Sequence, residues 1–410
     1  MSTQPEFVGP AQRTNTWILN EWYDQAVAGT QGDPVPPIEL WAWGFNEYGT
    51  LGQNNVIPYS SPVQIPGTWD ASTFKSEAPG NRGGQLNAGQ ECGSMTKRDG
   101  TLWYIGGVDF DMGTSGLNNT TEYSSPTQVG TDTTWTRPVG TLVTLSRKTD
   151  GTLWSWGRND YGQAGHNNRT NYSSPIQIGT DTTWNYVNAF GLVSMATKTD
   201  GSLWFWGDNE FGSWGTNQSN DIRRSSPVQM GNTGDWSNHN GFATSESILT
   251  AGIKSDNSLW TWGKNEYGQL GVSDKTQRSS PVQIPGTWKS FTWARNYAGL
   301  GIKTDGTLWS WGVNQTGRLG QNQPEATEYS SPKQIGTNTD WVRVGNTGRN
   351  SFGAVNASKE LYVWGKNDYG QLGINDRTTR SSPTQVPGTW YGVSTSYTGF
   401  GAQCLAAKLP

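Results

Sequence analysis

Leu153-Trp154-Ser155-Trp156-Gly157-Arg158-Asn159-Asp160-Tyr161-Gly162 is the stretch from which the fold can be inferred. Strand alternation places Trp154 and Trp156 on one face and Leu153 and Ser155 on the other. Gly157 lacks a Cβ atom, which suits the point where the chain leaves the strand for a loop. Related strands recur six more times, about fifty residues apart: Trp41–Gly44, Trp103–Gly106, Trp204–Gly207, Trp260–Gly263, Trp309–Gly312 and Tyr362–Gly365.

Every unit has the same order of elements. The Trp strand is followed by a Gly-x-x-Gly turn, a polar loop, Ser-Ser-Pro-x-Gln, a closing tryptophan and a Lys-Thr-Asp-Gly segment such as Lys148–Gly151. Asp-Gly between two alternating segments predicts a β-hairpin, so these aspartates are interpreted as turn residues. One unit cannot bury both faces of its sheet, but seven units packed face to face can. The sequence therefore predicts an all-β fold, a seven-bladed β-propeller.

The two ends of the repeat predict a closed ring. The first Trp strand, residues 39–44, has no hairpin arm before it, and residues 401–408 resemble that missing arm. We therefore expect the C-terminal strand to pair beside the N-terminal strand, which removes exposed sheet edges. The predicted organisation is an N-terminal arm with a Pro-rich linker over residues 1–38 and the propeller over residues 39–410.

The arm has two interpretations. A short helix is predicted over residues 16–26, with Ile18 and Trp22 on one face, followed by a stiff linker at Gly32–Pro37. Either the helix folds back on the propeller as a plug, or it is an anchor that mounts the propeller on a larger assembly. The anchor residues would be Trp17, Ile18, Trp22 and Tyr23.

The repeat resembles that of the regulator of chromosome condensation family, whose signature is similar to Leu259–Gly271 and Leu361–Gly373. The resemblance covers about residues 39–410 and implies a seven-bladed propeller, in a regular style like that of bacterial and tailed-phage members. The family's eukaryotic founder is an exchange factor for a small GTPase that uses a hairpin wedge and basic tails. No basic tail is present here, so exchange activity is kept only as an alternative.

Composition argues against several classes. Lys and Arg number 29 against 33 Asp and Glu, so there is no basic excess for nucleic-acid binding. We see no apolar run for membrane insertion and no secretory signal, and so expect synthesis in a cytoplasm. Cys92 and Cys404 are predicted to be free, partly buried thiols. No metal or cofactor pattern appears, and the two histidines lie in variable segments, His166 as an expected exposed loop residue. These features favour a non-enzymatic protein.

Variation between units marks the predicted binding rim. The residue before each Ser-Ser-Pro is large in every unit, and Tyr and Arg are favoured in binding hot spots. The alternative is that each packs within its own unit. The seven residues are Tyr59, Tyr123, Tyr172, Arg224, Arg278, Tyr329 and Arg380.

The resulting hypothesis is a recognition or structural scaffold. In its most concrete form it is a tailed-phage virion component attached by its arm. Its partners would then be other virion proteins or a host surface receptor, protein or glycan. The alternatives are a cytoplasmic protein-interaction scaffold and a small-GTPase regulator.

Overall fold

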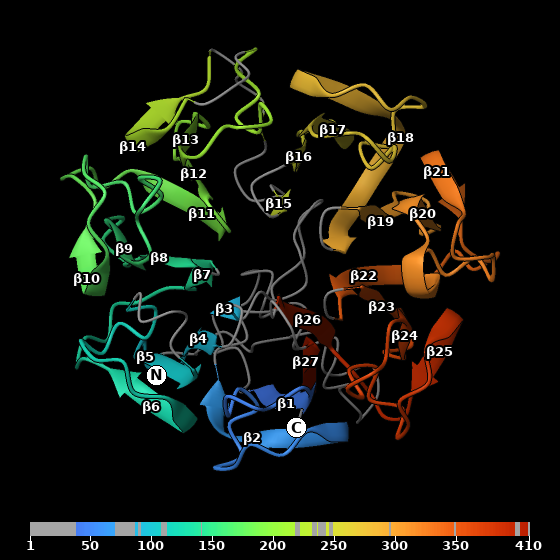
Figure 1. Cartoon of the computed structure of the whole chain (residues 1–410), viewed down its shortest axis with the longest axis horizontal. Helices are drawn as coiled ribbons and strands as arrows, with labels where there is room; N and C mark the ends of the chain where they lie inside the picture. The colour runs from blue at the N-terminus through green and yellow to red at the C-terminus, as the bar shows by residue number, and fades with distance from the viewer. Residues whose placement is uncertain are drawn as a thin grey trace, which may run out of the picture.

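Figure 1 shows the strands of the computed structural model arranged as a ring, viewed down its axis. Strands β26, β3, β7, β11, β15 and β22 lie nearest the centre. In the described residues the helical structure consists of one short 3-10 helix, η4 (Gln315–Gly317), so the predicted all-β propeller fold is confirmed. The structure describes residues 38–69, 87–88, 92–107, 113–140, 142–217, 222–231, 236, 243–245, 249–294, 297–347, 350–397 and 402–408.

Five of the sheets have four antiparallel strands each. The first contains β2 (Tyr59–Trp69), β1 (Ile38–Gly44), β27 (Ala402–Lys408) and β26 (Gly392–Tyr397), and the second β3 (Asn87–Ala88), β4 (Cys92–Thr96), β5 (Leu102–Gly106) and β6 (Tyr123–Val129). The third contains β7 (Val139–Gly140), β8 (Val143–Arg147), β9 (Leu153–Gly157) and β10 (Tyr172–Gln177). The others are β11 (Trp184–Phe190), β12 (Val193–Lys198), β13 (Leu203–Gly207) and β14 (Arg224–Gln229), and β22 (Trp341–Asn346), β23 (Ser351–Asn356), β24 (Leu361–Gly365) and β25 (Arg380–Val386).

A sixth, seven-stranded sheet corrects the prediction of seven separate blades. Its strands are β15 (Ala243–Ser245), β16 (Leu249–Ile253), β17 (Ser258–Gly263), β18 (Arg278–Ala294), β19 (Ala298–Lys303), β20 (Leu308–Val313) and β21 (Glu328–Gln334). The 17-residue β18 pairs with β17 through its first half and with β19 through its second. The described strands therefore form six sheets, two repeat units sharing one.

The backbone of β18 stays extended at the connection between two repeat units. Where the connection reads Ile-Gly-Thr-Asp-Thr-Thr, as after β10, the glycine adopts a left-handed turn conformation, with φ 59° at Gly179. Between β17 and β19 the connection is the shorter Ile284-Pro285-Gly286-Thr287, and Gly286 has φ 108°. The chain stays extended there and crosses directly from one group of strands into the next. The same Pro-Gly-Thr connection at Val386–Thr389, with φ 118° at Gly388, instead separates β25 from β26, so the short connection permits a continuous strand without requiring one.

The predicted alternation along the Trp strand is confirmed at β9. The rings of Trp154 and Trp156 both contact Trp135, at centroid distances of 5.7 and 5.9 Å. Leu153 instead belongs to a different core cluster, which includes Trp184. Both faces of the sheet are thus covered, and the hydrophobic cores lie between neighbouring sheets.

The predicted ring closure is also confirmed. Strand β27 pairs with β1 from Glu39–Lys408 to Gly44–Gln403, and with β26 on its other side. The first sheet is therefore built from both ends of the repeat region. The arm residues Trp17, Ile18, Trp22 and Tyr23 lie outside the described residues, so the choice between anchor and plug stays a prediction.

The Asp-Gly hairpins have the predicted turn role. Asp150 Oδ1 accepts hydrogen bonds from the backbone N–H of Thr152 at 2.9 Å and from its hydroxyl at 2.7 Å. These bonds hold the pKa of Asp150 below its usual value. Thr152 Oγ1 in turn accepts from Trp154 Nε1, and Lys148 Nζ lies 3.8 Å from the centre of the Trp154 ring. The hairpin therefore fixes the half-buried tryptophan of the strand and needs no catalytic explanation.

Candidate binding surface

In six of the seven units the long loop after the Trp strand begins with the asparagine of Trp-Gly-x-Asn, and the second unit has Val108 at this position. Asn159 is fully buried, and its Oδ1 accepts from Ala164 N at 2.8 Å. Its Nδ2 donates to the carbonyls of Asn168 and Thr170 at 3.1 and 3.0 Å. Asn46, Asn265 and Asn367 make the same set of bonds. These four asparagines thus bond the backbone of their own loops.

Each of these loops also contacts the next repeat unit. A loop residue in the left-handed conformation, such as Asn54 with φ 56°, donates its backbone N–H to the carbonyl of the first serine of the next Ser-Ser-Pro. The bond occurs at all seven junctions, between 2.5 and 2.9 Å: Asn54–Ser124, Asn118–Ser173, Asn167–Ser225, Asn217–Ser279, Ser273–Ser330, Asn322–Ser381 and Asn375–Ser60. The last of these joins the seventh unit to the first.

The second tryptophan of the Trp strand forms a matching bond in the opposite direction. Its indole Nε1 donates to a carbonyl in the Gly-x-x-Gly turn of the preceding unit at 2.8 to 3.1 Å. Six pairs occur: Trp43–Gln371, Trp156–Thr114, Trp206–Gln163, Trp262–Ser213, Trp311–Gln269 and Trp364–Arg318. The second unit has Ile105 at this position. The repeated polar and aromatic residues are thus used to join units.

The seven predicted rim residues occupy equivalent positions. Each pairs across the sheet with the glycine that ends its Trp strand, as Tyr59 does with Gly44 and Arg380 with Gly365. The other pairs are Tyr123–Gly106, Tyr172–Gly157, Arg224–Gly207, Arg278–Gly263 and Tyr329–Gly312. Six of the seven start an outer strand, and Tyr329 is the second residue of β21, so all lie where the long loop ends.

Most of these side chains are engaged within their own loops. The hydroxyls of Tyr59, Tyr123 and Tyr172 accept from asparagines four residues earlier, at 2.7 to 3.0 Å. Arg278 and Arg380 instead pair with Asp274 and Asp376, both four residues earlier and at 2.5 Å. The ring centre of Tyr329 lies 5.8 Å from Lys333 Nζ, and the Arg224 side chain is exposed. In these five units Tyr is thus matched with Asn and Arg with Asp. A partner-binding role for the seven residues stays a prediction.

His166 corrects one sequence expectation. It is half-buried, with Nε2 at 2.8 Å from Ser155 Oγ and its ring centroid 4.7 Å from that of Tyr172, whereas an exposed loop residue was predicted. Burial lowers its pKa. Ser155 is fully buried and donates its hydroxyl to Ala164 O at 2.7 Å, so this contact is a packing arrangement, not an accessible nucleophile.

Cys92 and Cys404 are buried thiols that are not joined in a disulfide. The pKa of Cys404 is raised well above its usual value by burial. Among the described residues no group of three or more His, Cys, Asp or Glu has a metal-binding arrangement. A search of the same residues finds no helix that is long and apolar enough to span a membrane.

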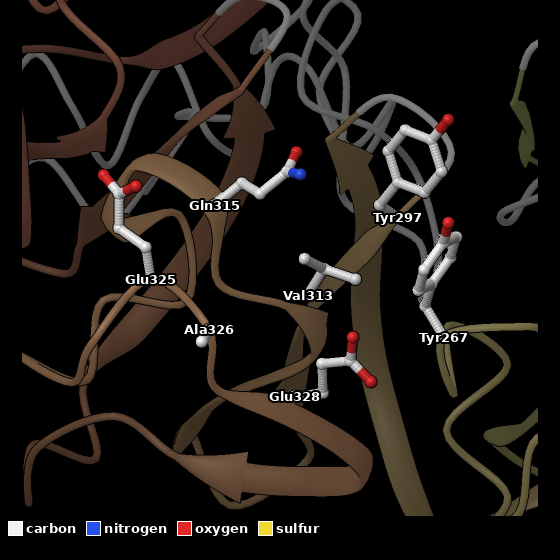
Figure 2. A pocket seen from close by; sticks show the side chains of 7 residues that line it. All are labelled: Tyr267, Tyr297, Val313, Gln315, Glu325, Ala326 and Glu328. Carbon is white, nitrogen blue, oxygen red and sulfur yellow. The ribbon is translucent and has the colours of Figure 1, made fainter.

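A cavity with a volume of about 340 Å³ lies between the fifth and sixth units, among the loops that follow the Trp strands. Figure 2 shows Tyr267 and Tyr297 along one wall, with Gln315, Val313 and Glu328 facing them and Glu325 at the far end. The tyrosine rings meet edge to face, with centroids 5.4 Å apart.

Sequence analysis missed this site. The loop that carries Glu325 is two residues longer than most of its counterparts, and that length difference is the signal that points to it.

Five segments of the chain match the family model described as regulator of chromosome condensation (RCC1) repeat: residues 39–73, 150–188, 256–293, 305–346 and 360–390. The chain therefore contains RCC1 repeats, as the sequence predicts. It is 25% identical over 150 residues to the ultraviolet-B receptor UVR8 of Arabidopsis thaliana, a match that covers 33% of this chain and 32% of that protein. It is 24% identical over 141 residues to the X-linked retinitis pigmentosa GTPase regulator of Canis lupus familiaris, covering 33% of this chain and 14% of that protein. The matches thus span a third or less of these relatives.

Solved structures share the fold. The structure is similar to Prp20p of Saccharomyces cerevisiae, with a TM-score of 0.72, 17% identity and coverage of 92% of this chain and 93% of that one. It is also similar to human WBSCR16, with a TM-score of 0.70, 20% identity and coverage of 90% and 98%. At these identities the likeness concerns the fold alone. All four relatives are eukaryotic, so the predicted likeness to phage members remains a prediction.

Proposed function

We propose that this chain is a non-enzymatic recognition scaffold that binds a protein partner through its loop face. The loop face is defined here as the loops between each Trp strand and the following Ser-Ser-Pro strand. The observation that carries the proposal is that different residues of each unit serve the frame and the loop tips. The repeated Asn, Ser and Trp residues hold the ring together, whereas the loop tips differ between units. Variable loops on a rigid frame are typical of binding proteins.

The loop tip of the first unit exposes apolar side chains next to a rim residue. Val56 and Ile57 are 55% and 60% exposed, and Tyr59 follows two residues later. Adjacent exposed aliphatic side chains are unfavourable in water and gain free energy when a partner covers them. They contribute little to the stability of the ring, so they provide a clean test of binding.

The double variant Val56→Ser/Ile57→Ser is expected to lose its partner while it keeps the melting temperature of the parent chain. The matched control is Ile176→Ser, which removes a side chain that is 37% exposed but lies within strand β10, away from the loops. Affinity capture from the source cells with quantitative mass spectrometry compares the three proteins. Equal capture by the double variant and the control would remove the loop face from the proposal.

A narrower proposal is that the chain is a structural component of a tailed-phage virion, attached through residues 1–38. Its support is the layout of the sequence, with an amphipathic segment and a Pro-rich linker ahead of a rigid propeller. A chain that lacks residues 1–38 is then expected to fold with an unchanged melting temperature but to be absent from purified particles. Unfolding of the shortened chain would support the plug instead, and detection of the full chain only in host cytoplasm would contradict the virion role.

Regulation of a small GTPase is the second candidate, favoured by the match to a GTPase regulator and by the likeness to Prp20p, whose reported structure concerns binding to Gsp1p and histones. Nucleotide release from a panel of small GTPases distinguishes the two candidates. Acceleration by the chain would establish the second one, whereas unchanged release supports the scaffold.

A further inference from the structure

We propose that the cavity between Tyr267, Tyr297 and Glu328 binds a guanidinium group, the side chain of an arginine on a protein partner. This inference rests on the proposed function, because the cavity lies among the loops that form the loop face. Its volume of about 340 Å³ lies at the lower end of the range for ligand pockets, which suits one long side chain.

The lining has the chemistry that a cation requires. The lining contains two carboxylates and two aromatic rings but no Lys or Arg. The buried Arg318 lies behind it, with its guanidinium carbon 6.0 Å from the centre of the Tyr297 ring and Nη2 donating to Gln315 Oε1 at 3.1 Å. Glu328 pairs with Lys275 at 2.6 Å, and the Lys275 side chain is 55% exposed, so this ion pair is solvated and weak. Within the described part of the chain, Glu325 has no ion-pair partner. A guanidinium group can stack on the tyrosine rings and bond a carboxylate at the same time.

The walls are held in place before any ligand arrives. Tyr297 O accepts from Val313 N at 2.8 Å, and Tyr267 N donates to Gln269 Oε1 at 2.9 Å. The turn with Glu325 is fixed as well, since Thr327 N donates to Pro324 O at 3.0 Å and its own carbonyl accepts from Asn314 N at 2.9 Å. A preformed site loses little conformational entropy on binding.

The repeat itself supplies an internal comparison. At the junction of the third and fourth units, Tyr161 occupies the position of Tyr267, Asp208 that of Val313 and Arg223 that of Glu328. There the Arg223 guanidinium lies 4.2 Å from the Tyr161 ring centre and 3.4 Å from Asp208 Oδ1. The equivalent aromatic ring is thus already covered by an arginine of the same chain.

At two other junctions, a residue of the next unit also covers the aromatic ring equivalent to Tyr267. Lys264, equivalent to Val313, places Nζ 5.1 Å from the Phe211 ring of the preceding unit. Phe45, also equivalent to Val313, packs against Tyr369 at 5.3 Å. At the junction of the fifth and sixth units the residue is the short Val313, and the arginine is replaced by Glu328. A cavity therefore remains beside the Tyr267 ring. The negative charge of Glu328, in place of the positive charge of Arg223, suits a cation from outside the chain.

The test is a titration of the full chain with the peptide acetyl-Gly-Gly-Arg-Gly-Gly-amide, followed by calorimetry. The matched probe has citrulline in place of arginine, which keeps the shape and removes the charge. The arginine peptide is expected to bind at least about tenfold more tightly than the citrulline peptide. A lysine peptide tests the planar geometry and is expected to bind more weakly than the arginine peptide. Methyl glucoside tests a glycan ligand.

Two variants tie binding to the cavity. Val313→Lys introduces the cation that the fourth–fifth junction carries as Lys264 and is expected to abolish binding of the arginine peptide. Tyr267→Leu removes the ring and is expected to weaken binding about tenfold. Both are compared at an equal folded fraction, measured by circular dichroism. Equal affinity for the citrulline peptide, displacement of the arginine peptide by methyl glucoside, or binding unchanged in both variants would overturn the proposal.

These outcomes separate the cavity from the proposed function. If the arginine peptide does not bind but partner capture still depends on Val56 and Ile57, the cavity inference is wrong and the scaffold stands. If the peptide binds to the cavity and capture is independent of the loop tips, the scaffold proposal fails in its present form.

Discussion

Removal of residues 402–410 is expected to unfold most of the protein at room temperature. Strand β27 is an interior strand of its sheet, bonded to β1 on one side and to β26 on the other. At most 1% of the surface of each of four of its residues is exposed to solvent: Cys404, Leu405, Ala406 and Ala407. The deletion takes away this burial, separates β1 from β26 and opens the ring. We expect the loss to approach the whole stability of a typical domain, about 5–15 kcal/mol.

A circular permutant provides the control. Lys408 is the register partner of Glu39, so an Asp-Gly turn can join β27 to β1 as in the other hairpins. A chain that starts at residue 401, turns after 408 and continues from 39 to 400 contains every strand. Its melting temperature by circular dichroism is expected to lie within a few degrees of the parent. A cooperative transition of the truncated chain at the parent temperature would show that closure contributes little.

Trp311→Ala is expected to lower the free energy of unfolding by about 3–5 kcal/mol. The side chain is fully buried and packs against Trp288 and Trp293, with ring centroids 5.6 and 5.7 Å away. Its indole N–H also donates to Gln269 O across the unit boundary at 2.9 Å. The substitution creates a cavity and leaves that carbonyl without this donor.

The chain offers a matched variant for this site. The second unit carries Ile105 where the others carry the second tryptophan, and Ile105 is 1% exposed. Trp311→Ile is therefore expected to cost clearly less than Trp311→Ala, because it refills part of the volume with a residue that the repeat already accepts. Urea denaturation of the three proteins measures both differences. Equal midpoints for alanine and tryptophan would contradict the proposed role of Trp311 between units.

Sequence reasoning succeeded where the relevant contacts are local. The alternation of Trp154 and Trp156 and the Asp-Gly turn at Asp150 both depend on residues a few positions apart. The closing of the ring was also predictable, because the missing hairpin arm at one end matches the surplus arm at the other. It failed at β18, where one strand belongs to two groups although the same Pro-Gly-Thr connection separates β25 from β26.

The seven rim residues illustrate the limit of that reasoning. Their equivalent positions follow from the repeat period. The pairing of five of them with an Asn or Asp four residues earlier depends on the path of the loop between them. The cavity next to Tyr267 could not be predicted from the repeat, because its size depends on the side chains of the sixth unit, such as the short Val313.

The sequence by itself therefore determined the unit, its strands and turns, and the ring in which the units are placed, because a seven-fold periodic pattern repeats the same short-range information. Only the tertiary structure decided how units are joined and where one junction is left open. Those contacts involve residues about fifty positions apart, or 328 between Trp43 and Gln371, and each depends on the volume and charge of a side chain from another unit.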